Sequence, residues 1–202
     1  MKTILLISAA LNVVLLFLLF KKRKKQNDNI ASEIDKKDST NADNQKTDFL
    51  QSKINTFKTF AAGLPNETNK HESLLHKLAT ETQAVQGALY LIHKNDDRTF
   101  LRFNCGYAFY CPESKPIEFE MGEGLIGQVA KDKKTLMLNT APEEHIPAVS
   151  GLGKAVPQHL IICPLVKNDI IVGVMELAAF HPFDTEFENF IEAASKIVTE
   201  TL

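Results

Sequence analysis

The sequence predicts an α+β fold, an antiparallel sheet of about six strands with helices packed on it, preceded by an N-terminal transmembrane helix. Strand-like segments come in close pairs joined by short turns, without the regular crossover helices that a parallel sheet requires. Apolar side chains at helical spacing flank these segments on both sides, and a long apolar run occupies the N-terminus. The 202 residues suit one domain and an extension.

Residues 1–20 are predicted to be a transmembrane anchor. The run Ile4–Phe20 contains only two polar residues, and with Thr3 it has the eighteen residues that a membrane-spanning helix needs. Lys21–Lys25 follow at once, so the positive-inside rule predicts that the C-terminal side lies in the cytoplasm, at the inner membrane of a bacterial cell. The alternative is a cleaved signal peptide, which would carry its charges before the apolar run and a small-residue cleavage site after it. Here most of the charges follow the run, and no such site is found.

The charge of the chain is divided unevenly. Residues 1–65 contain eleven Lys/Arg and six Asp/Glu, a net charge of +5, whereas residues 66–202 contain twelve and nineteen, a net charge of −7. An acidic globular part argues against nucleic acid as a partner, because phosphate binding requires a basic face. Residues 26–48 are polar and almost free of large apolar side chains, so residues 21–48 are predicted to be a basic, then polar, flexible linker.

A short amphipathic helix is predicted over residues 49–65. Pro65 ends it, because proline inside a helix removes a hydrogen-bond donor and clashes with the preceding turn. Two interpretations of its apolar stripe stay open: a coiled coil that makes a homodimer, or a helix that lies on its own domain, since two heptads are too few to decide. The stripe has spacings of four and three residues: Leu50, Ile54, Phe57, Ala61 and Leu64.

Residues 66–202 are predicted to form the globular domain. A helix over Asn69–Gln83 precedes a hairpin of strands Gly87–Lys94 and Thr99–Tyr107, and Asp184 is the expected N-cap of a final helix. Thr140–Pro157, with three prolines and two glycines, is expected to be irregular, with at most a helical turn. Between the hairpin and the final helix, the further elements expected are the strand Pro116–Met121, the helix Leu125–Lys131, the strand Thr135–Asn139 and a second hairpin of His159–Val166 and Ile170–Phe180.

Two segments together resemble a GAF domain over about residues 66–202. They are GEGLIGQVAKDKKTLMLN and LIICPLVKNDIIVGVMELAAFHPFDTEFENFIEAASKIV. The resemblance rests on the glycine turn that enters a helix, the proline-leucine strand, the glycine-valine step and the phenylalanine before the last helix. It implies a GAF/PAS-like fold that senses a small molecule, with ligands bound between the sheet and the layer of Gly124–Lys131 and Thr140–Pro157.

The glycines of the turn are predicted to be structural. Gly122 and Gly124 can adopt positive φ and bend the chain from strand to helix, while Gly127 lets the helix sit close to a neighbouring strand. Gly173 is expected to permit close packing inside its own strand. The alternative, a nucleotide-phosphate loop, would need a βαβ unit and an acidic residue about twenty positions later, and both are missing.

Nine residues are candidates to line the ligand pocket, and for each of them a plain packing or surface role is the alternative. Four are apolar: Phe119, Leu125, Val129 and Met137. Five are polar: His145, Ser150, His159, Cys163 and Glu176. No metal site is expected, because His71 and His76 are five residues apart on a helix and cannot share one ion. The sequence names no cofactor.

The chain lacks most of the residues that mark two functional subsets of the GAF family. Where cyclic-nucleotide-binding domains carry an Asn-Lys pair and an aspartate, this chain has Ala179, Phe180 and Phe187. Where the methionine sulfoxide reductases carry a cysteine before the third glycine, it has Ile126, and no thiol follows His145-Ile146. We therefore expect no enzyme activity, with a thiol-dependent redox enzyme as the least favoured interpretation; the chain's thiols are Cys105, Cys111 and Cys163.

The sequence therefore predicts a membrane-tethered cytoplasmic GAF-like module that binds a small molecule or transmits a signal through dimerisation. The alternative is a ligand-free dimerisation or protein-docking scaffold. The expected partners are the inner membrane, contacted through residues 4–20 and Lys21–Lys25, a second copy of the chain, and a separate signalling protein that supplies the output.

Overall fold

The computed structural model describes residues 46–202 except 66–68, 96–97, 110–115, 143–146 and 151–152. The predicted anchor and almost all of the predicted linker therefore lie outside the described residues. Among the residues that are described, no helix is long and apolar enough to cross a membrane. The chain divides into two compact units, Met1–Phe49 and Leu50–Leu202, and the sheet and its helices belong to the second unit.

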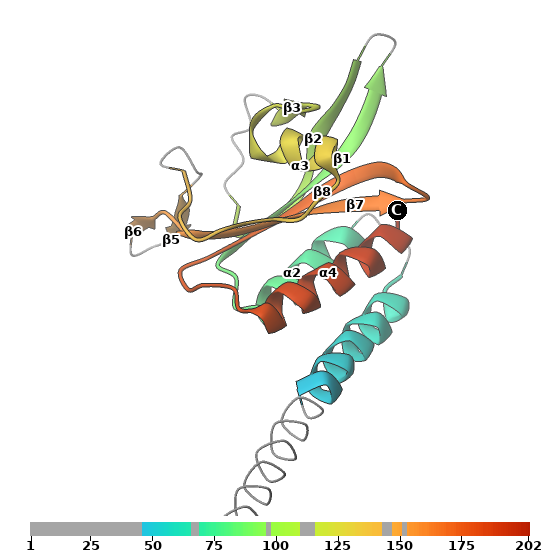
Figure 1. The fold of residues 1–202 in the computed structure, drawn as a ribbon, viewed down its shortest axis with the longest axis vertical. Coiled ribbons are helices and arrows are strands. Elements are labelled where there is room, and N and C mark those ends of the chain that lie inside the picture. The colour runs from blue at the N-terminus through green and yellow to red at the C-terminus, as the bar shows by residue number, and fades with distance from the viewer. Residues whose placement is uncertain (1–45, 66–68, 96–97, 110–115, 143–146, 151–152) are drawn as a thin grey trace, which may run out of the picture. The chain divides into compact units, whose positions relative to one another are not determined.

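A six-stranded antiparallel sheet forms the centre of the domain, as the sequence predicts (Figure 1). Its strands are ordered β3-β2-β1-β8-β7-β4, so the two predicted hairpins lie side by side and pair through their β1 and β8 strands. The strands are β1 (Gln86–Asn95), β2 (Arg98–Tyr107), β3 (Glu118–Glu120), β4 (Leu136–Leu138), β7 (His159–Lys167) and β8 (Ile170–Ala179).

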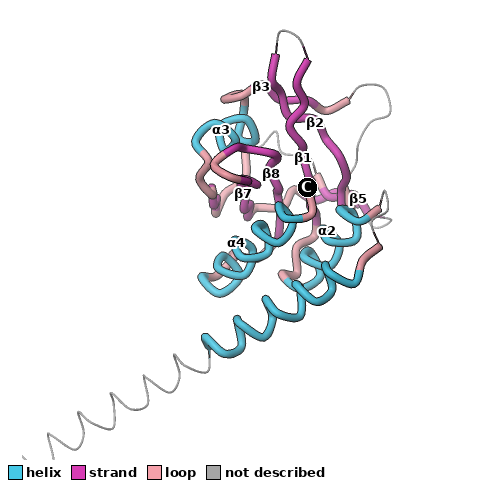
Figure 2. Tube along the Cα trace, turned by 90° about the vertical axis from the view of Figure 1, so that its right-hand side faces the viewer, coloured by secondary structure: helices cyan, strands magenta, loops and turns pink. Residues whose placement is uncertain are grey.

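Helices cover both faces of the sheet. Figures 1 and 2 show α2 (Lys70–Glu81) and α4 (Thr185–Glu200) beside each other against one face, and α3 (Gly124–Asp132) against the opposite face. We call these the α4 face and the α3 face. The strands alternate between them because successive side chains point to opposite sides: in β8, Met175 belongs to the core on the α4 face, whereas Val174 belongs to the core on the α3 face.

Residues 46–63 form a helix, which includes the last residues of the predicted linker. Its apolar stripe packs on the domain of its own chain: Phe57 and Ala61 are buried in the core of the α4 face. The Phe57 ring meets the Phe190 ring of α4 edge to face, with the centroids 6.0 Å apart. The apolar stripe therefore packs on the chain's own domain, as the second of the two interpretations of this helix expects. The homodimer stays a prediction.

Two glycines of the turn have backbone angles that favour glycine. Gly122 and Gly124 have φ values of +90° and +57°, the left-handed region that disfavours side chains. A Cβ atom at Gly173 would lie 2.6 Å from the Tyr90 carbonyl oxygen of the neighbouring strand, which is too close for a side chain. The turn places α3 over one face of the sheet.

Two short strands lie within Thr140–Pro157, which the sequence predicts to be irregular. Strands β5 (Ala148–Ser150) and β6 (Gly153–Ala155) form a separate antiparallel pair within it. The expectation of an irregular stretch with at most a helical turn is therefore wrong for these residues. Three-residue strands bounded by proline and glycine have too few residues to show a period of two. The predicted N-cap of the last helix is confirmed, since the Asp184 carboxylate accepts from the Phe187 N–H at 2.9 Å.

Candidate functional site

Two buried polar side chains lie on the α3 face of the sheet, near the start of β1 and the end of β8. Gln86 at the start of β1 pairs with Ala178 near the end of β8, and the next same-face pair is Ala88 with Glu176. Because paired residues of antiparallel strands share a face, all four side chains project to the side of Ala88, which belongs to the core of the α3 face. We call Gln86, Ala88, Glu176 and Ala178 the polar floor.

The Gln86 carboxamide is only half satisfied. The side chain is 1% exposed. Its Nε2 donates to the Ala108 carbonyl oxygen at 3.4 Å, whereas the buried Oε1 has no hydrogen-bond partner among the described residues. A buried polar atom left without a partner costs about 1–3 kcal/mol of stability. A ligand that donates a hydrogen bond to Oε1 would remove this cost.

Glu176 is the second polar group of the floor, with 7% of its surface exposed. It pairs with Ala88 on one side and with Ile162 of β7 on the other, and both neighbours belong to the apolar core. The carboxylate is not without a partner, but its two oxygens together offer about four acceptor sites. A carboxylate in such apolar surroundings is usually tied to a specific function, because burying its charge is unfavourable.

Packed aromatic rings adjoin the polar floor on the same face. The Tyr90 ring is contacted edge to face by Phe103 at 5.9 Å and by Phe119 at 5.5 Å between centroids. Phe103 stacks in turn on Phe109 at 5.3 Å. These contacts restrict the motion of the rings, so the polar floor borders on a well-packed part of the core.

The structure divides the predicted pocket residues between the two faces of the sheet. Phe119, Leu125 and Val129 belong to the core of the α3 face, the side on which Glu176 also lies. Met137 and Cys163 belong to the core of the α4 face. A single pocket cannot include both groups, so their joint placement in one pocket is wrong: side chains alternate along a strand, and sequence proximity to the loop does not decide the face.

Among the remaining polar candidates, His159 does not join the floor. His159 pairs with Ala179, a residue of the α4-face core, so it projects away from the polar floor. Ser150 lies in β5, at a position whose side chain is not described, and His145 lies outside the described residues. Glu176 is thus the one polar candidate with a described side chain that lies on the floor.

The described thiols are poor nucleophiles. Burial raises the pKa of Cys163 to about 12, partly offset by a hydrogen bond with Thr135. Burial, followed by the negative charge of Glu72, raises the pKa of Cys105 to about 12 as well. Both side chains are free thiols and stay protonated at neutral pH, whereas thiol catalysis requires the thiolate. Cys111 lies outside the described residues.

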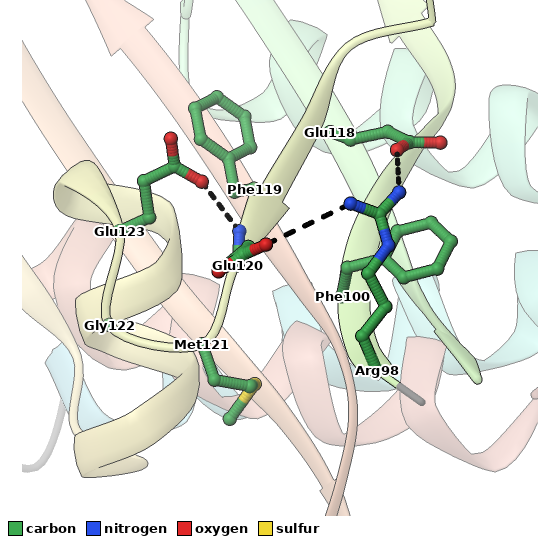
Figure 3. Close-up of a pocket in the computed structure, with 8 residues that line it drawn as sticks. All are labelled: Arg98, Phe100, Glu118, Phe119, Glu120, Met121, Gly122 and Glu123. Carbon is green, nitrogen blue, oxygen red and sulfur yellow. Dashed lines mark hydrogen bonds and ion pairs between the residues drawn. The ribbon is translucent and has the colours of Figure 1, made fainter. Parts of the chain in front are cut away.

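A surface pocket of about 490 Å³ lies beside the glycine turn (Figure 3). Arg98 bonds Glu118 at 3.0 Å and approaches Glu120 at 3.8 Å, and its guanidinium covers the buried Phe100 ring at 4.6 Å. The Glu123 carboxylate accepts from the backbone N–H of Glu120 at 2.7 Å. These charged groups are already engaged with one another or with backbone, so the pocket has an evident structural role at the edge strand β3.

Sequence reasoning missed Gln86, the most deeply buried polar side chain of the floor. Its only signal in the sequence is a polar residue directly before the apolar run that starts β1. A glutamine in that position is ordinarily the exposed first residue of a strand. Among the described residues, no group of three His, Cys, Asp or Glu side chains comes close enough together to hold a metal ion.

An antiparallel six-stranded sheet with helices on both faces defines an α+β domain. The family profile of the GAF domain matches residues 72–202. The chain therefore belongs to the GAF domain family, as the resemblance of its sequence implies.

Solved structures share this fold at low sequence identity. The GAF domain of a phosphoenolpyruvate-protein phosphotransferase from Coxiella burnetii has a TM-score of 0.62 at 17% identity, and the match covers 75% of this chain and 90% of that one. The GAF domain of nlh2 from A. aeolicus in an inactive state has a TM-score of 0.58 at 17% identity, with 75% and 94% covered. The similarity shows a shared fold.

An enzyme also has this fold. A free methionine-R-sulfoxide reductase from Neisseria meningitidis, solved in complex with its substrate, has a TM-score of 0.57 at 18% identity, with 75% of this chain and 87% of that one covered. Fold similarity at this identity therefore does not separate binding from catalysis. Among curated proteins, no sequence is similar enough to count as a relative.

Proposed function

We propose that this protein is a membrane-tethered cytoplasmic GAF module that binds a small molecule on the polar floor and transmits the signal to a second copy or to a separate output protein. Family membership supports the sensory class. The apolar run Ile4–Phe20, followed at once by Lys21–Lys25, supports the anchor and its orientation.

The observation that carries the binding proposal is the half-satisfied Gln86 beside the buried Glu176. A domain that only needed a core would place apolar side chains at both positions, because each buried polar group must find partners or lower stability. Polar groups kept at such a cost are characteristic of sites where the partner is a ligand.

Two other functions have less support. A thiol enzyme would need a thiolate, and burial raises the pKa of both Cys105 and Cys163 to about 12. A ligand-free scaffold would need a docking surface, yet the predicted dimerisation stripe packs on its own domain through Phe57 and Ala61. We therefore favour small-molecule binding over both.

The binding proposal is tested by the melting temperature of the full-length protein in detergent micelles, measured against a panel of metabolites. A ligand present at 100 times its dissociation constant adds about 2.7 kcal/mol of stability. For a domain of this size that is a rise of roughly 5–10 °C. A protein whose melting temperature stays constant across the panel, but which captures a partner protein, would be the scaffold instead.

The tether is tested by protease digestion of membrane vesicles from cells that produce the chain. Inside-out vesicles should lose residues 46–202 to added protease, right-side-out vesicles should protect them, and deletion of residues 1–20 should release the domain into the soluble fraction. A mature chain that lacks residues 1–20, or a domain digested from the outer side, would refute the proposed orientation.

A further inference from the structure

We propose that a groove along α4 binds a short peptide with free ends, whose amino group meets Glu188 and Glu192 and whose carboxylate meets Lys134 and Lys196. This groove, which we call the α4 groove, has a volume of about 450 Å³. It is lined by α4, which covers the face of the sheet opposite the polar floor. The inference therefore goes beyond the proposed function and does not depend on it.

The α4 groove exists because β4 ends before β7 does. β4 pairs only with Leu160–Ile162 of β7, and the chain before β4 belongs to the end of α3. Beyond Ile162, no described strand pairs with the outer edge of β7. This leaves a space between α4 on one side and residues 133–135 on the other, and Pro164 and Val166 of β7 also line it.

One end of the α4 groove is negatively charged. Ala179 at the end of β8 pairs with His159 at the start of β7, and α4 begins at Thr185 soon afterwards, so α4 runs in the same direction as β7. The first half of α4 contributes Glu188 and Glu192 to the groove. Neither carboxylate makes an ion pair or a hydrogen bond with a described residue.

The other end is positively charged. Lys196 lies one turn of α4 beyond Glu192, and Lys134 lines the groove from the side opposite α4. The neighbouring Lys133 locates this end, because its ammonium bonds the Asp169 carboxylate at 3.1 Å in the turn that follows β7. Lys134 and Lys196 have no ion pair or hydrogen bond with a described residue, so both ammonium groups are left for a ligand.

The separation of the two ends decides the length and charge of the ligand. Glu188 and Lys196 are eight positions apart, about 12 Å along an α-helix. An extended peptide rises about 3.3 Å per residue, so roughly three or four residues span this distance, whereas a single amino acid is too short. A ligand with one charge would be attracted to one end and repelled by the other, but a peptide with free ends matches both.

Two buried hydroxyls of α4 line the same groove. Ser195 and Thr199 are 6% and 5% exposed. Each hydroxyl donates its proton to a carbonyl of α4 at 2.8 Å, so each oxygen can only accept from a ligand. Peptide N–H groups are donors of that kind, whereas the methylene chain of an elongated ω-amino acid offers none. The hydroxyls therefore favour a peptide over other zwitterions of the same length.

The experiment measures binding of a tetrapeptide of three alanines and one tryptophan to the full-length protein in a non-ionic detergent. The chain contains no tryptophan, so the anisotropy of the probe's own emission reports binding. Matched probes carry an acetylated amino end, an amidated carboxyl end, or both. We expect the free-ended probe to bind most tightly, and each block to weaken it roughly fivefold. Added salt should weaken the free-ended probe most.

Two double variants assign the two ends of the probe. Glu188→Gln/Glu192→Gln should abolish the effect of acetylation and keep that of amidation, and Lys134→Gln/Lys196→Gln should do the reverse. A general loss of packing would not separate the two ends in this way, and both variants should keep the melting temperature of the wild type. Glu72→Gln/Lys58→Gln changes two exposed residues outside the groove and is the matched control, which should bind as the wild type does.

Three results would overturn the inference. They are equal affinities of the four probes, an unchanged preference for free ends in both groove variants, and no binding of the free-ended probe at millimolar concentration. None of them bears on the polar floor, which the metabolite panel tests separately.

Discussion

A Cβ atom on Gly127 would lie 2.2 Å from the backbone carbonyl oxygen of Glu120. The two residues belong to α3 and β3, and the Gly122 N–H that follows β3 donates to the Gly127 carbonyl at 2.8 Å. Helix and strand thus touch backbone to backbone, without any side chain between them. This contact fixes how α3 lies over the sheet, and with it the boundary between the core of the α3 face and the polar floor.

Replacing Gly127 with alanine should therefore destabilise the domain. The added methyl group meets a backbone atom, which cannot move aside as a side chain would, and overpacking of this kind typically costs about 1–3 kcal/mol. Urea denaturation followed by circular dichroism measures the change. Gly63→Ala is the matched control, because nothing lies within 4 Å of a Cβ there; equal stabilities of the two variants would contradict the backbone contact.

Replacing Phe57 with alanine should reveal the docking of the 46–63 helix. Phe57 is 1% exposed and contacts Phe190, so its truncation leaves a cavity that costs about 3–5 kcal/mol. Phe49 of the same helix is 54% exposed, and Phe49→Ala should change the free energy of unfolding by less than about 0.5 kcal/mol. If Phe57→Ala instead leaves the unfolding of the monomer unchanged and weakens a dimer, the stripe serves dimerisation after all.

The described thiols should react slowly in the native protein. With Cys111 replaced by serine, Cys105 and Cys163 should be modified by a thiol reagent at pH 8 far more slowly than after denaturation. Their raised pKa leaves little thiolate, and access is restricted further for Cys163, which is buried, than for the half-buried Cys105. Modification of either at the rate of the denatured chain would show a reactive thiol and would reopen the redox interpretation.

The raised pKa of Cys163 also predicts how the free energy of unfolding depends on pH in the alkaline range. The pKa of Cys163 rises from an ordinary 9.0 to about 12 on folding, so the unfolded chain releases this proton at lower pH than the folded one. The stabilisation that the protonated Cys163 thiol contributes is complete below pH 9. It is lost as pH rises towards 12, by at most about 1.4 kcal/mol per pH unit. The free energy of unfolding of Cys163→Ala, measured between pH 8 and pH 10.5, should fall less steeply than that of the wild type.

The local structure could be predicted from the sequence because residues that are close in the chain determine it. The paired apolar strands, the glycine turn and the Asp184 cap each depend on residues that are close in the chain. The faces of the sheet were not predictable in this way: Met137 and Cys163 are separated from Glu176 by the pairing of distant strands. Gln86 was missed for the same reason, since its burial depends on Ala178 and Ala108, far away in sequence.

Hydrogen–deuterium exchange of the full-length protein in detergent, with and without the low-molecular-mass fraction of an extract from the cells that produce it, locates the binding site of an unidentified ligand. A ligand on the polar floor should slow exchange in residues 86–91 and 173–178, which form the paired segments of β1 and β8. Exchange in α4 and at the β1–β2 hairpin tip should stay as it is. An extract that slows no amide of the domain, or slows only those of the 46–63 helix and α4, would contradict ligand binding on the polar floor.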